Sequence, residues 1–301
     1  MARLDSVDLR LLRVFVTVVE ARGFSAAQTM LNVNTSTISN QITALETRLG
    51  VKLCQRGRAG FKLTEDGATI FSETQKLFSA IDGFDMRASA LRANVRGRLN
   101  IGLLDNTISD KQARVEGLLH KFTQMMGDVQ INLEVKSPNE LLRDVLDGKL
   151  HVAIGSFPKV LLGLSYAKLY EERHYFYCAA SHPLFELKEN EITQVVIAKY
   201  RLVSRGYWGS RDAKHIRSER ASATVNNMEA AARLILSGDY LGYLPEHYAK
   251  GWEQAKTIKK LLPEELSYLA PFEIAYDPAK LALPPVKLFT SLAASVLARE
   301  A

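Results

Sequence analysis

The chain has 301 residues, of which 47% are hydrophobic and 24% charged, a composition that fits a globular protein of two or three domains. The chain has only two cysteines, which argues against a protein stabilised by disulfides, and it has no signal-peptide pattern and no apolar run long enough to span a membrane. We therefore expect a cytoplasmic protein without a membrane partner. Residues 1–64 hold nine Lys and Arg against four Asp and Glu, which places +5 of the net charge of +6 there and indicates a polyanionic partner.

The first ninety residues are predicted to be mostly helical. Apolar residues at helical spacing predict a helix over about residues 7–21, and Ser25 is suited to cap a short second helix. A third helix is expected over 36–49. Residues 51–64 contain two short strand-like pieces around a Gly- and Arg-rich turn, which predicts a small hairpin. A long helix over 65–92 has no obvious core of its own, so we expect it to pair with a copy of itself.

The third helix carries short polar side chains opposite its apolar stripe. Two helices joined by a tight turn, with the second one polar on its outer face, form a helix-turn-helix. Short hydroxyl and amide groups let the helix approach base edges, where Asn can pair with adenine and Thr can contact thymine. The predicted base-reading residues are Thr35, Ser36, Thr37, Ser39 and Asn40. The residues predicted to contact DNA phosphates or the minor groove are Arg56, Arg58 and Lys62.

A polar surface helix in an ordinary helical bundle is the alternative explanation of the third helix. The basic hairpin that follows it in the chain favours DNA binding over that alternative.

After Gly97 the pattern changes to alternating strands and helices. Helices are expected over 110–126 and over 286–299, with two more in PNELLRDVLDGK and NNMEAAARLILSG. Strands are expected at RLNIGLL, VQINLEV, HVAIGS, RHYFYCAA, YRLVS, YLGYLP and FEIAYD. This alternation predicts an α/β fold with largely parallel sheets and helices on both faces. In such sheets a ligand binds in the crevice at the carboxyl ends of the strands.

Residues 15–67 contain a run of motifs, namely Phe24-Ser25-Ala26-Ala27, Leu31-x-Val33, Ile38-Ser39, Gln41-Ile42, Leu45-Glu46, Leu49-Gly50-Val51-x-Leu53, Arg56 and Leu63-Thr64-x-x-Gly67. Together they resemble the winged helix-turn-helix of the LysR-type transcriptional regulators. The resemblance continues weakly through RLNIG, HVAIG, SHPL and ILSGDYLGYLP, so that it spans nearly the whole chain.

Four positions depart from the family pattern. Asn34-Thr35-Ser36 stands where the family usually has Ser-Gln-Pro, and Asn40 replaces a usual Arg or Lys. We therefore expect an altered operator preference. Cys54 takes a usual Phe position, and His151 stands where Asp is common. None of these changes is expected to break the fold.

The resemblance implies an N-terminal all-α winged helix-turn-helix plus linker helix, and a C-terminal α/β two-lobed periplasmic-binding-protein-like (type II) effector domain. We place the DNA-binding domain at 1–64, the linker and dimerisation helix at 65–92, and the effector-binding domain at 93–301. The two lobes of the effector-binding domain are predicted at 98–162 plus 270–301, and at 163–269.

Candidate effector-binding residues lie at strand ends and helix starts. They are Asn106, Thr107, Ser137, Ser156, Ser204, Arg205 and Asn226. By position, Asn106, Thr107, Ser156 and Ser204 match places where the family's effector sites lie. Small polar groups and helix N-termini favour a polar or anionic metabolite, with Arg205 as its carboxylate clamp. The alternative for each Ser or Thr is a simple helix cap.

The predicted function is a sequence-specific transcriptional regulator. It binds a double-stranded DNA operator as a homodimer or homotetramer and responds to a small-molecule effector, with RNA polymerase as a further partner. We expect no catalytic residue and no cofactor, because the chain lacks GxSxG, HExxH, GxGxxG and P-loop motifs. His174, Cys178 and His182 are spaced at fours, but along a strand each lies about 13 Å from the next, so no metal site is expected.

Two alternatives stay open from the sequence. One is a helix-turn-helix tethered to a metabolite-processing enzyme, and the other is an architectural DNA binder that senses no ligand.

Overall fold

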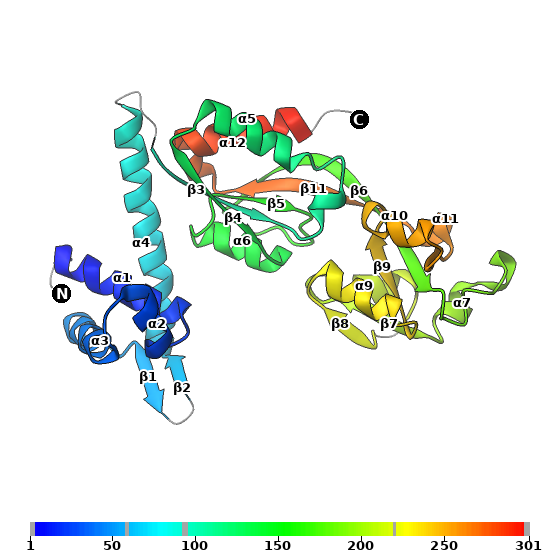
Figure 1. The fold of residues 1–301 in the computed structure, drawn as a ribbon, viewed down its shortest axis with the longest axis horizontal. Helices are drawn as coiled ribbons and strands as arrows, with labels where there is room; N and C mark the ends of the chain where they lie inside the picture. The colour runs from blue at the N-terminus through cyan, green and yellow to red at the C-terminus, as the bar shows by residue number, and fades with distance from the viewer. Residues whose placement is uncertain (1–3, 58–59, 92–95, 219–220, 298–301) are drawn as a thin grey trace. The chain divides into compact units, whose positions relative to one another are not determined.

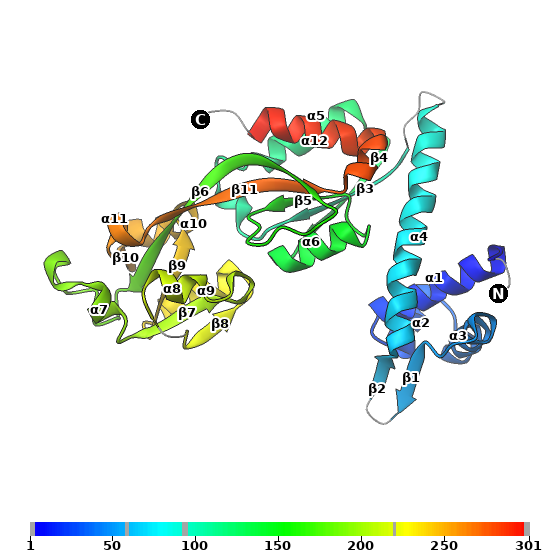
Figure 2. The same cartoon turned by 180° about the vertical axis from the view of Figure 1, so that it is seen from behind.

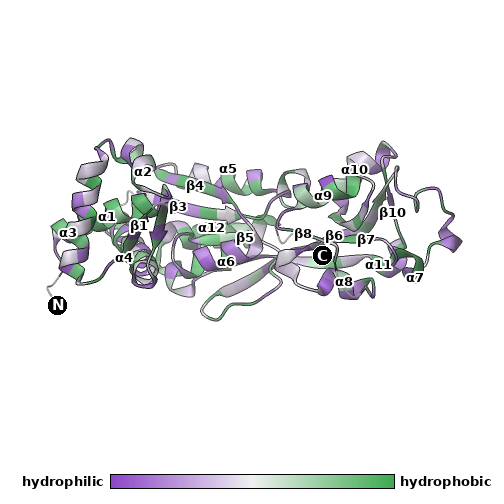
Figure 3. Ribbon diagram, turned by 90° about the horizontal axis from the view of Figure 1, so that it is seen from below, coloured by the Kyte–Doolittle hydropathy of each residue, from purple (hydrophilic) through white to green (hydrophobic). Residues whose placement is uncertain are grey.

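The computed structural model describes residues 4–57, 60–91, 96–218 and 221–297 (Figures 1 and 2). The chain divides into an N-terminal unit, Met1–Phe84 with Asp147–Lys149, and a C-terminal unit, Asp85–Leu146 with Leu150–Ala301. Figure 3 shows that the helices of both units carry hydrophobic as well as hydrophilic residues. Within the described ranges, no helix is both long enough and apolar enough to cross a membrane.

The N-terminal unit consists of helices and a hairpin. Its elements are α1 (Ser6–Glu20), α2 (Phe24–Leu31), α3 (Thr35–Leu49), β1 (Cys54–Gly57), β2 (Gly60–Leu63) and the long α4 (Glu65–Ala90) as far as Phe84. The predicted first, third and long helices therefore form within one or two residues of their expected bounds, and the predicted hairpin forms within 51–64. The prediction that Ser25 caps the second helix is wrong, because α2 begins at Phe24 with Gly23 as its N-cap. Phe15, Ile38 and Leu45 are fully buried in its core, and Ile70 and Leu77 of α4 pack against them.

Local chemistry sets the ends of these helices. Asp5 caps α1 by accepting hydrogen bonds from the backbone N–H groups of Val7 and Asp8. Asn34 caps α3 in the same way through the N–H of Thr37. Gly50 ends α3 in the left-handed conformation at φ 73°, which glycine adopts without steric cost.

The C-terminal unit is built on a sheet of nine strands. They are β3 (Gly97–Leu103), β4 (Val129–Val135), β5 (Val152–Gly155), β6 (Ser165–Ala179), β7 (Arg201–Arg205), β8 (Ala223–Val225), β9 (Tyr240–Pro245), β10 (Ile258–Lys260) and β11 (Tyr268–Tyr276). Their order is β4-β3-β5-β11-β6-β9-β7-β8, with β10 paired to β6. The sheet is mixed, whereas the sequence predicted it to be largely parallel. Each antiparallel pair of this sheet involves β6, β11 or both, which are its two longest strands.

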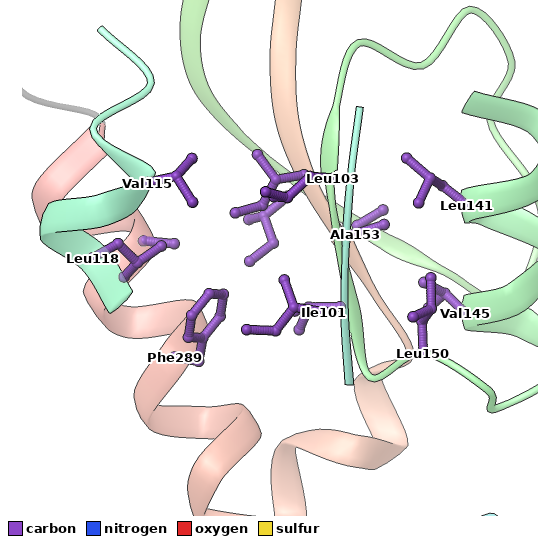
Figure 4. Close-up of a cluster of buried hydrophobic side chains, with 14 of the residues drawn as sticks. Ile101, Leu103, Val115, Leu118, Leu141, Val145, Leu150, Ala153 and Phe289 are labelled. Atoms are coloured by element: carbon purple, nitrogen blue, oxygen red, sulfur yellow. The ribbon is translucent and has the colours of Figure 1, made fainter. Parts of the chain in front are cut away.

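Helices cover both faces of the part of the sheet formed by β3, β4 and β5. Here α5 (Val115–Met125) and α12 (Pro284–Leu297) lie on one face, and α6 (Pro138–Leu146) lies on the other (Figure 1). In Figure 4, Val115, Leu118 and Phe289 lie on one side of β3, and Leu141 and Val145 lie on the other. All five side chains are buried. We call this part the first lobe.

The second lobe has its own buried clusters. They form around Phe176, Leu202 and Leu241 and around Tyr177, Val203 and Leu244. Its helices are η2 (Glu189–Glu191), α7 (Gln194–Ile197), η3 (Gly206–Trp208), α8 (Arg211–His215), α9 (Met228–Leu236), α10 (Glu246–Gln254) and α11 (Pro263–Leu266), while η1 (Thr107–Ser109) and η4 (Pro278–Ala282) belong to the first lobe.

Two predicted elements have other bounds than expected, and β8, β10, α7, α8, α10 and α11 were not predicted. The helix predicted over 110–126 begins only at Val115, because Arg114 before it has the left-handed conformation at φ 40°, which does not continue a right-handed helix. The strand predicted at RHYFYCAA is the second half of a strand that begins at Ser165. The predicted lobe limits, 98–162 plus 270–301 and 163–269, stay a prediction.

Candidate nucleic-acid interface and effector site

The helix-turn-helix is formed by α2 and α3. Asn32 ends α2 in the left-handed conformation at φ 53°, and a short turn leads to α3. The five predicted base-reading residues all lie within the first six residues of α3. Ser36 and Asn40 are exposed on its outer face, whereas Thr35, Thr37 and Ser39 are half-buried.

The start of α3 is fixed by its cap. The Asn34 side-chain oxygen accepts hydrogen bonds from the Ser36 hydroxyl at 2.7 Å and from the Thr37 N–H at 2.8 Å. This geometry holds Ser36 at the helix N-terminus, where the first-turn N–H groups can face a phosphate. Thr43, one turn beyond Asn40, is also exposed, and its hydroxyl donates to the Ser39 carbonyl at 3.0 Å. The predicted set of base-reading residues did not include Thr43.

The hairpin β1–β2 has the position of a wing. Lys62 lies on β2 with its side chain exposed, and Arg56 lies on β1 opposite Phe61. Arg58, the third predicted phosphate contact, lies outside the described residues.

A buried carboxylate joins the wing to α3. Glu46 Oε1 accepts hydrogen bonds from the N–H groups of Leu53 at 2.9 Å and Cys54 at 3.3 Å. Its Oε2 pairs with Lys52 Nζ at 2.7 Å. Burial alone would raise the pKa of Glu46, but Lys52 and the two backbone donors outweigh burial and lower it. The Leu45-Glu46 motif therefore positions the hairpin beside the recognition helix.

The close approach of α4 to the wing requires a glycine. A Cβ at Gly67 would lie 2.0 Å from the Leu53 carbonyl oxygen. Thr64 completes this junction by donating its hydroxyl to the Lys52 carbonyl at 2.6 Å and accepting from the Gly67 N–H at 2.8 Å.

The predicted effector residues of the first lobe lie at the ends of three adjacent parallel strands, β4, β3 and β5. Asn106 follows β3 in the left-handed conformation at φ 71°, and its buried Oδ1 has no hydrogen-bond partner among the described residues. Thr107 begins η1, and Ser156 is buried after β5. Ser137 follows β4 and hydrogen-bonds Glu140 in the first turn of α6, which is the helix-cap alternative.

The predicted residues of the second lobe lie at the ends of β7 and β8, which are also parallel neighbours. Ser204 is buried on β7 and donates its hydroxyl to the Gly209 carbonyl at 3.3 Å. Asn226 is exposed after β8. The N-cap of α9 is Asn227 and not Asn226.

Arg205 is buried and already paired. Its guanidinium bonds Asp212 through Nε at 3.0 Å and Nη2 at 2.5 Å, and Nη2 also bonds the Tyr268 hydroxyl. The guanidinium carbon lies 4.4 Å from the centre of the Trp208 ring. Arg205 would have to leave these partners to clamp an effector carboxylate, as the sequence suggested.

Asp105 is the residue that the sequence analysis missed. It follows β3 directly, and its Oδ2 accepts a hydrogen bond of 2.6 Å from the N–H of Met228, the first residue of α9. Burial raises the pKa of Asp105, its hydrogen bonds partly offset that effect, and the negative charge of Glu172 adds to it. The hydrogen bond joins the strand ends of the first lobe to a helix N-terminus of the second lobe.

A winged helix-turn-helix followed by a two-lobed α/β domain defines a class of ligand-responsive DNA-binding regulators. Comparison with known families agrees with this class. Residues 9–68 match the family described as bacterial regulatory helix-turn-helix protein, lysR family. Residues 92–298 match the LysR substrate binding domain. The chain therefore belongs to the LysR family and is a DNA-binding transcriptional regulator with an effector-binding domain.

Individual relatives support this assignment. The chain is similar to the HTH-type transcriptional activator BauR of Pseudomonas aeruginosa, with 39% identity over 269 residues that cover 89% of this chain and 88% of BauR. Its fold is similar to that of full-length CbnR complexed with its target DNA, with a TM-score of 0.64, 19% identity and coverage of 97% and 100% of the two chains. A full-length OxyR variant from Pseudomonas aeruginosa has a TM-score of 0.62, 18% identity and coverage of 97% and 95%.

Proposed function

We propose that this regulator reads its operator with the outer face of α3 and holds DNA phosphate with the wing. Ser36 and Asn40 are exposed on one face of the helix, which is the observation that carries this proposal. Asn40 has the donor and acceptor needed for a bidentate contact with adenine. Lys62, and with it the predicted contacts Arg56 and Arg58, adds charge for the phosphates.

Selection of bound sequences from a random duplex pool, followed by affinity measurements on the selected operator, tests the proposed interface. Asn40→Ala should cost about 1–3 kcal/mol and relax preference at one base step. Lys62→Ala should weaken all DNA sequences alike and lower the slope of affinity against salt by about one. An equal loss on all sequences for Asn40→Ala would contradict its role in base reading.

We propose that the protein acts as a homodimer that pairs through α4, and that two dimers form a homotetramer. Phe84 on α4 is 65% exposed. A cavity of about 480 Å³ opens between α1, α3 and α4, and Leu12, Ile70 and Leu77 line it. Such apolar surface favours coverage by a second copy of the chain. Light scattering should show dimers or tetramers, and Phe84→Glu should lower the measured mass.

The effector is proposed to be an anionic metabolite that replaces Asp105 at the N-terminus of α9. The hydrogen bond of 2.6 Å between Asp105 Oδ2 and the Met228 N–H carries this proposal. A helix N-terminus favours a negative group, and here a side chain of the other lobe supplies it. A carboxylate that takes this place would release the first lobe from the second, and the change in lobe orientation would reach the DNA-binding unit.

A metabolite screen by thermal shift tests the effector proposal. An effector at 100 times its Kd should add about 2.7 kcal/mol of stability. Asp105→Ala removes the competing carboxylate, so it should tighten binding of an anionic effector. Asp239→Ala, which removes an exposed aspartate after the end of α9, is the control and should leave that affinity unchanged. Weaker anion binding in Asp105→Ala would overturn the proposal.

We further propose that the regulator activates transcription through RNA polymerase, as the activator function in the name of BauR suggests. The effector-binding domain would bind its metabolite without converting it and without a cofactor, in the cytoplasm where the operator DNA lies. Transcription from the selected operator with purified polymerase should rise when the effector is added. Turnover of the same metabolite in a parallel reaction would favour the enzyme alternative.

A further inference from the structure

Three potential metal ligands lie together where both lobes meet the crossover strand β6. Asp110 follows η1 in the first lobe, Glu172 lies on β6, and His247 is the second residue of α10 in the second lobe. One ligand atom from each side chain lies within 4.8 Å of the other two. His247 Nε2 is 2.9 Å from Glu172 Oε1 and 3.9 Å from Asp110 Oδ2. Three elements that are distant in the sequence thus converge on one point.

We propose that Asp110, Glu172 and His247 bind one divalent transition-metal ion. Zn²⁺ bonds nitrogen and oxygen ligands at about 2.0–2.2 Å, which in a tetrahedral site separates the ligand atoms by roughly 3.3 Å. The distances of 2.9 and 3.9 Å from His247 Nε2 lie on either side of that value, and the two carboxylate oxygens lie within 4.8 Å of each other, so the side chains must draw together around the ion. One imidazole with two carboxylates is a donor set for Zn²⁺ or Mn²⁺.

Each of the three proposed metal ligands is oriented by a hydrogen bond to a neighbouring group. His247 Nδ1 lies 2.9 Å from the Ser109 hydroxyl, and with its proton on Nδ1 the ring presents the Nε2 lone pair to the other two side chains. Glu172 Oε2 is held by His174 Nε2 at 2.5 Å, which leaves Oε1 for a metal ion. Asp110 Oδ1 accepts a hydrogen bond of 2.9 Å from the Gln112 N–H, which leaves Asp110 Oδ2 for the metal ion.

Burial and charge favour a divalent cation at this point. Asp110 and Glu172 are 9% and 6% exposed, and two buried negative charges need compensation. The nearby Tyr170 hydroxyl is buried without a hydrogen-bond partner of acceptable geometry among the described residues.

A cavity gives access to the three ligands. Its volume is about 850 Å³, and Asp110, Glu172, His247 and Tyr170 all line it. It leaves room for water molecules that complete the coordination. A metal ion bound here links the first lobe to the second and holds the lobes in the described arrangement. The site thus gives the regulator a second input, a metal ion, which is separate from the anionic effector.

Calorimetric titration of the full-length, chelator-treated protein with Zn²⁺ tests the site. We expect one ion per chain, with affinity lowered roughly tenfold or more in His247→Gln and in Asp110→Asn. The matched control is His120→Gln, which removes an exposed imidazole on α5 and should leave the affinity unchanged. In the wild-type protein, Zn²⁺ should also slow amide hydrogen exchange in α10, a readout that needs no variant.

Two results would overturn the metal site. One is unchanged Zn²⁺ affinity in folded His247→Gln, and the other is the lack of Zn²⁺ or Mn²⁺ binding by the folded wild-type protein. Operator binding is measured on the same samples, because it depends on α3 and not on this cluster. If the wild-type protein binds its operator but neither Zn²⁺ nor Mn²⁺, the metal site alone is refuted.

Discussion

Glu46→Ala is expected to loosen the wing from the recognition helix. The Glu46 side chain is 8% exposed, and its Oε1 accepts from the N–H of Leu53, a residue that is fully buried, and from that of Cys54. Alanine leaves both N–H groups without this acceptor. A buried donor without a partner costs about 1–3 kcal/mol. The ion pair with Lys52 adds little, because the Lys52 side chain is 75% exposed.

The buried Leu53 donor alone gives an expected loss of about 1–3 kcal/mol for the N-terminal unit, and the half-buried Cys54 donor adds to that loss. For a unit of this size, each 1 kcal/mol lowers the melting temperature by about 4–8 °C. Thermal unfolding of the full chain should therefore show an early transition in Glu46→Ala. Amide hydrogen exchange should assign that transition to β1 and β2. Affinity for the selected operator should fall as well.

Two further variants separate the hydrogen bonds from the charge. Glu46→Gln keeps an oxygen acceptor and should cost less than about 1 kcal/mol. Glu73→Ala breaks an exposed ion pair of 2.9 Å with Lys76, so it should leave the melting temperature nearly unchanged. If Glu46→Ala has the same melting temperature as Glu73→Ala, the Glu46 carboxylate does not hold the wing. If glutamine is as damaging as alanine, the charge matters more than the hydrogen bonds.

Three other substitutions test contacts of the described structure. Gly67→Ala places a Cβ 2.0 Å from a backbone carbonyl oxygen, so the helix start must shift, and denaturant unfolding should show a loss of about 1–3 kcal/mol. Arg205→Met leaves the buried carboxylate of Asp212 without its cation and should cost about 3–5 kcal/mol, seen as a lower melting temperature of the C-terminal unit. Asp8 has its pKa lowered from 3.8 to about 2, chiefly by its hydrogen bond to Arg48. Its contribution to stability is therefore present above about pH 4 and is lost as the pH falls towards 2, so melting curves of Asp8→Asn should lack that part of the acid sensitivity.

The elements of the N-terminal unit could be predicted from the sequence because each depends on local rules. The apolar spacing of Ile38, Ile42 and Leu45 defines the buried face of α3, and all three are buried in the structure. Asn34 and Gly50, residue types typical of helix ends, cap it. The partners of Glu46 were not predictable in this way, because they depend on where the chain returns after α3.

The substitution at position 151 shows how the fold tolerates a departure from the family pattern. His151 is buried, and its Nδ1 accepts the Asn100 N–H at 2.9 Å. Burial lowers the pKa of His151 to about 4, so the ring is neutral and offers a lone pair. A neutral imidazole can thus supply the acceptor that an aspartate would supply, which the sequence alone did not reveal.

The candidate sites of the C-terminal unit were only partly predictable. The positions of Asn106, Ser156 and Asn226 after strand ends could be predicted, because neighbouring parallel strands end at the same edge of the sheet. Their role in effector binding stays a prediction. The Asp105 contact with Met228 was missed because it joins residues 123 positions apart in the sequence. Arg205 was assigned to a ligand because nothing in the sequence shows that Asp212 already neutralises it.

Asp105 and Asp110 belong to one short segment after β3, so the two proposed binding sites share this segment. Asp105 bonds α9, and Ser109 in the same segment bonds His247 on α10, so both contacts join the first lobe to the second. An anionic effector that displaces Asp105 would release this segment, whereas a metal ion on Asp110 and His247 would hold it. The two proposed ligands are therefore expected to weaken each other's binding, and thermodynamic linkage requires that each lowers the affinity for the other by the same factor.

Zn²⁺ titrations with and without a saturating effector measure that factor. We expect the effector to weaken Zn²⁺ binding, and Zn²⁺ to weaken effector binding by the same ratio. Asp105→Ala already lacks the contact that the effector displaces, so the ratio should fall towards one in that variant. Equal Zn²⁺ affinities with and without effector in the wild-type protein would show that the segment does not couple the two sites.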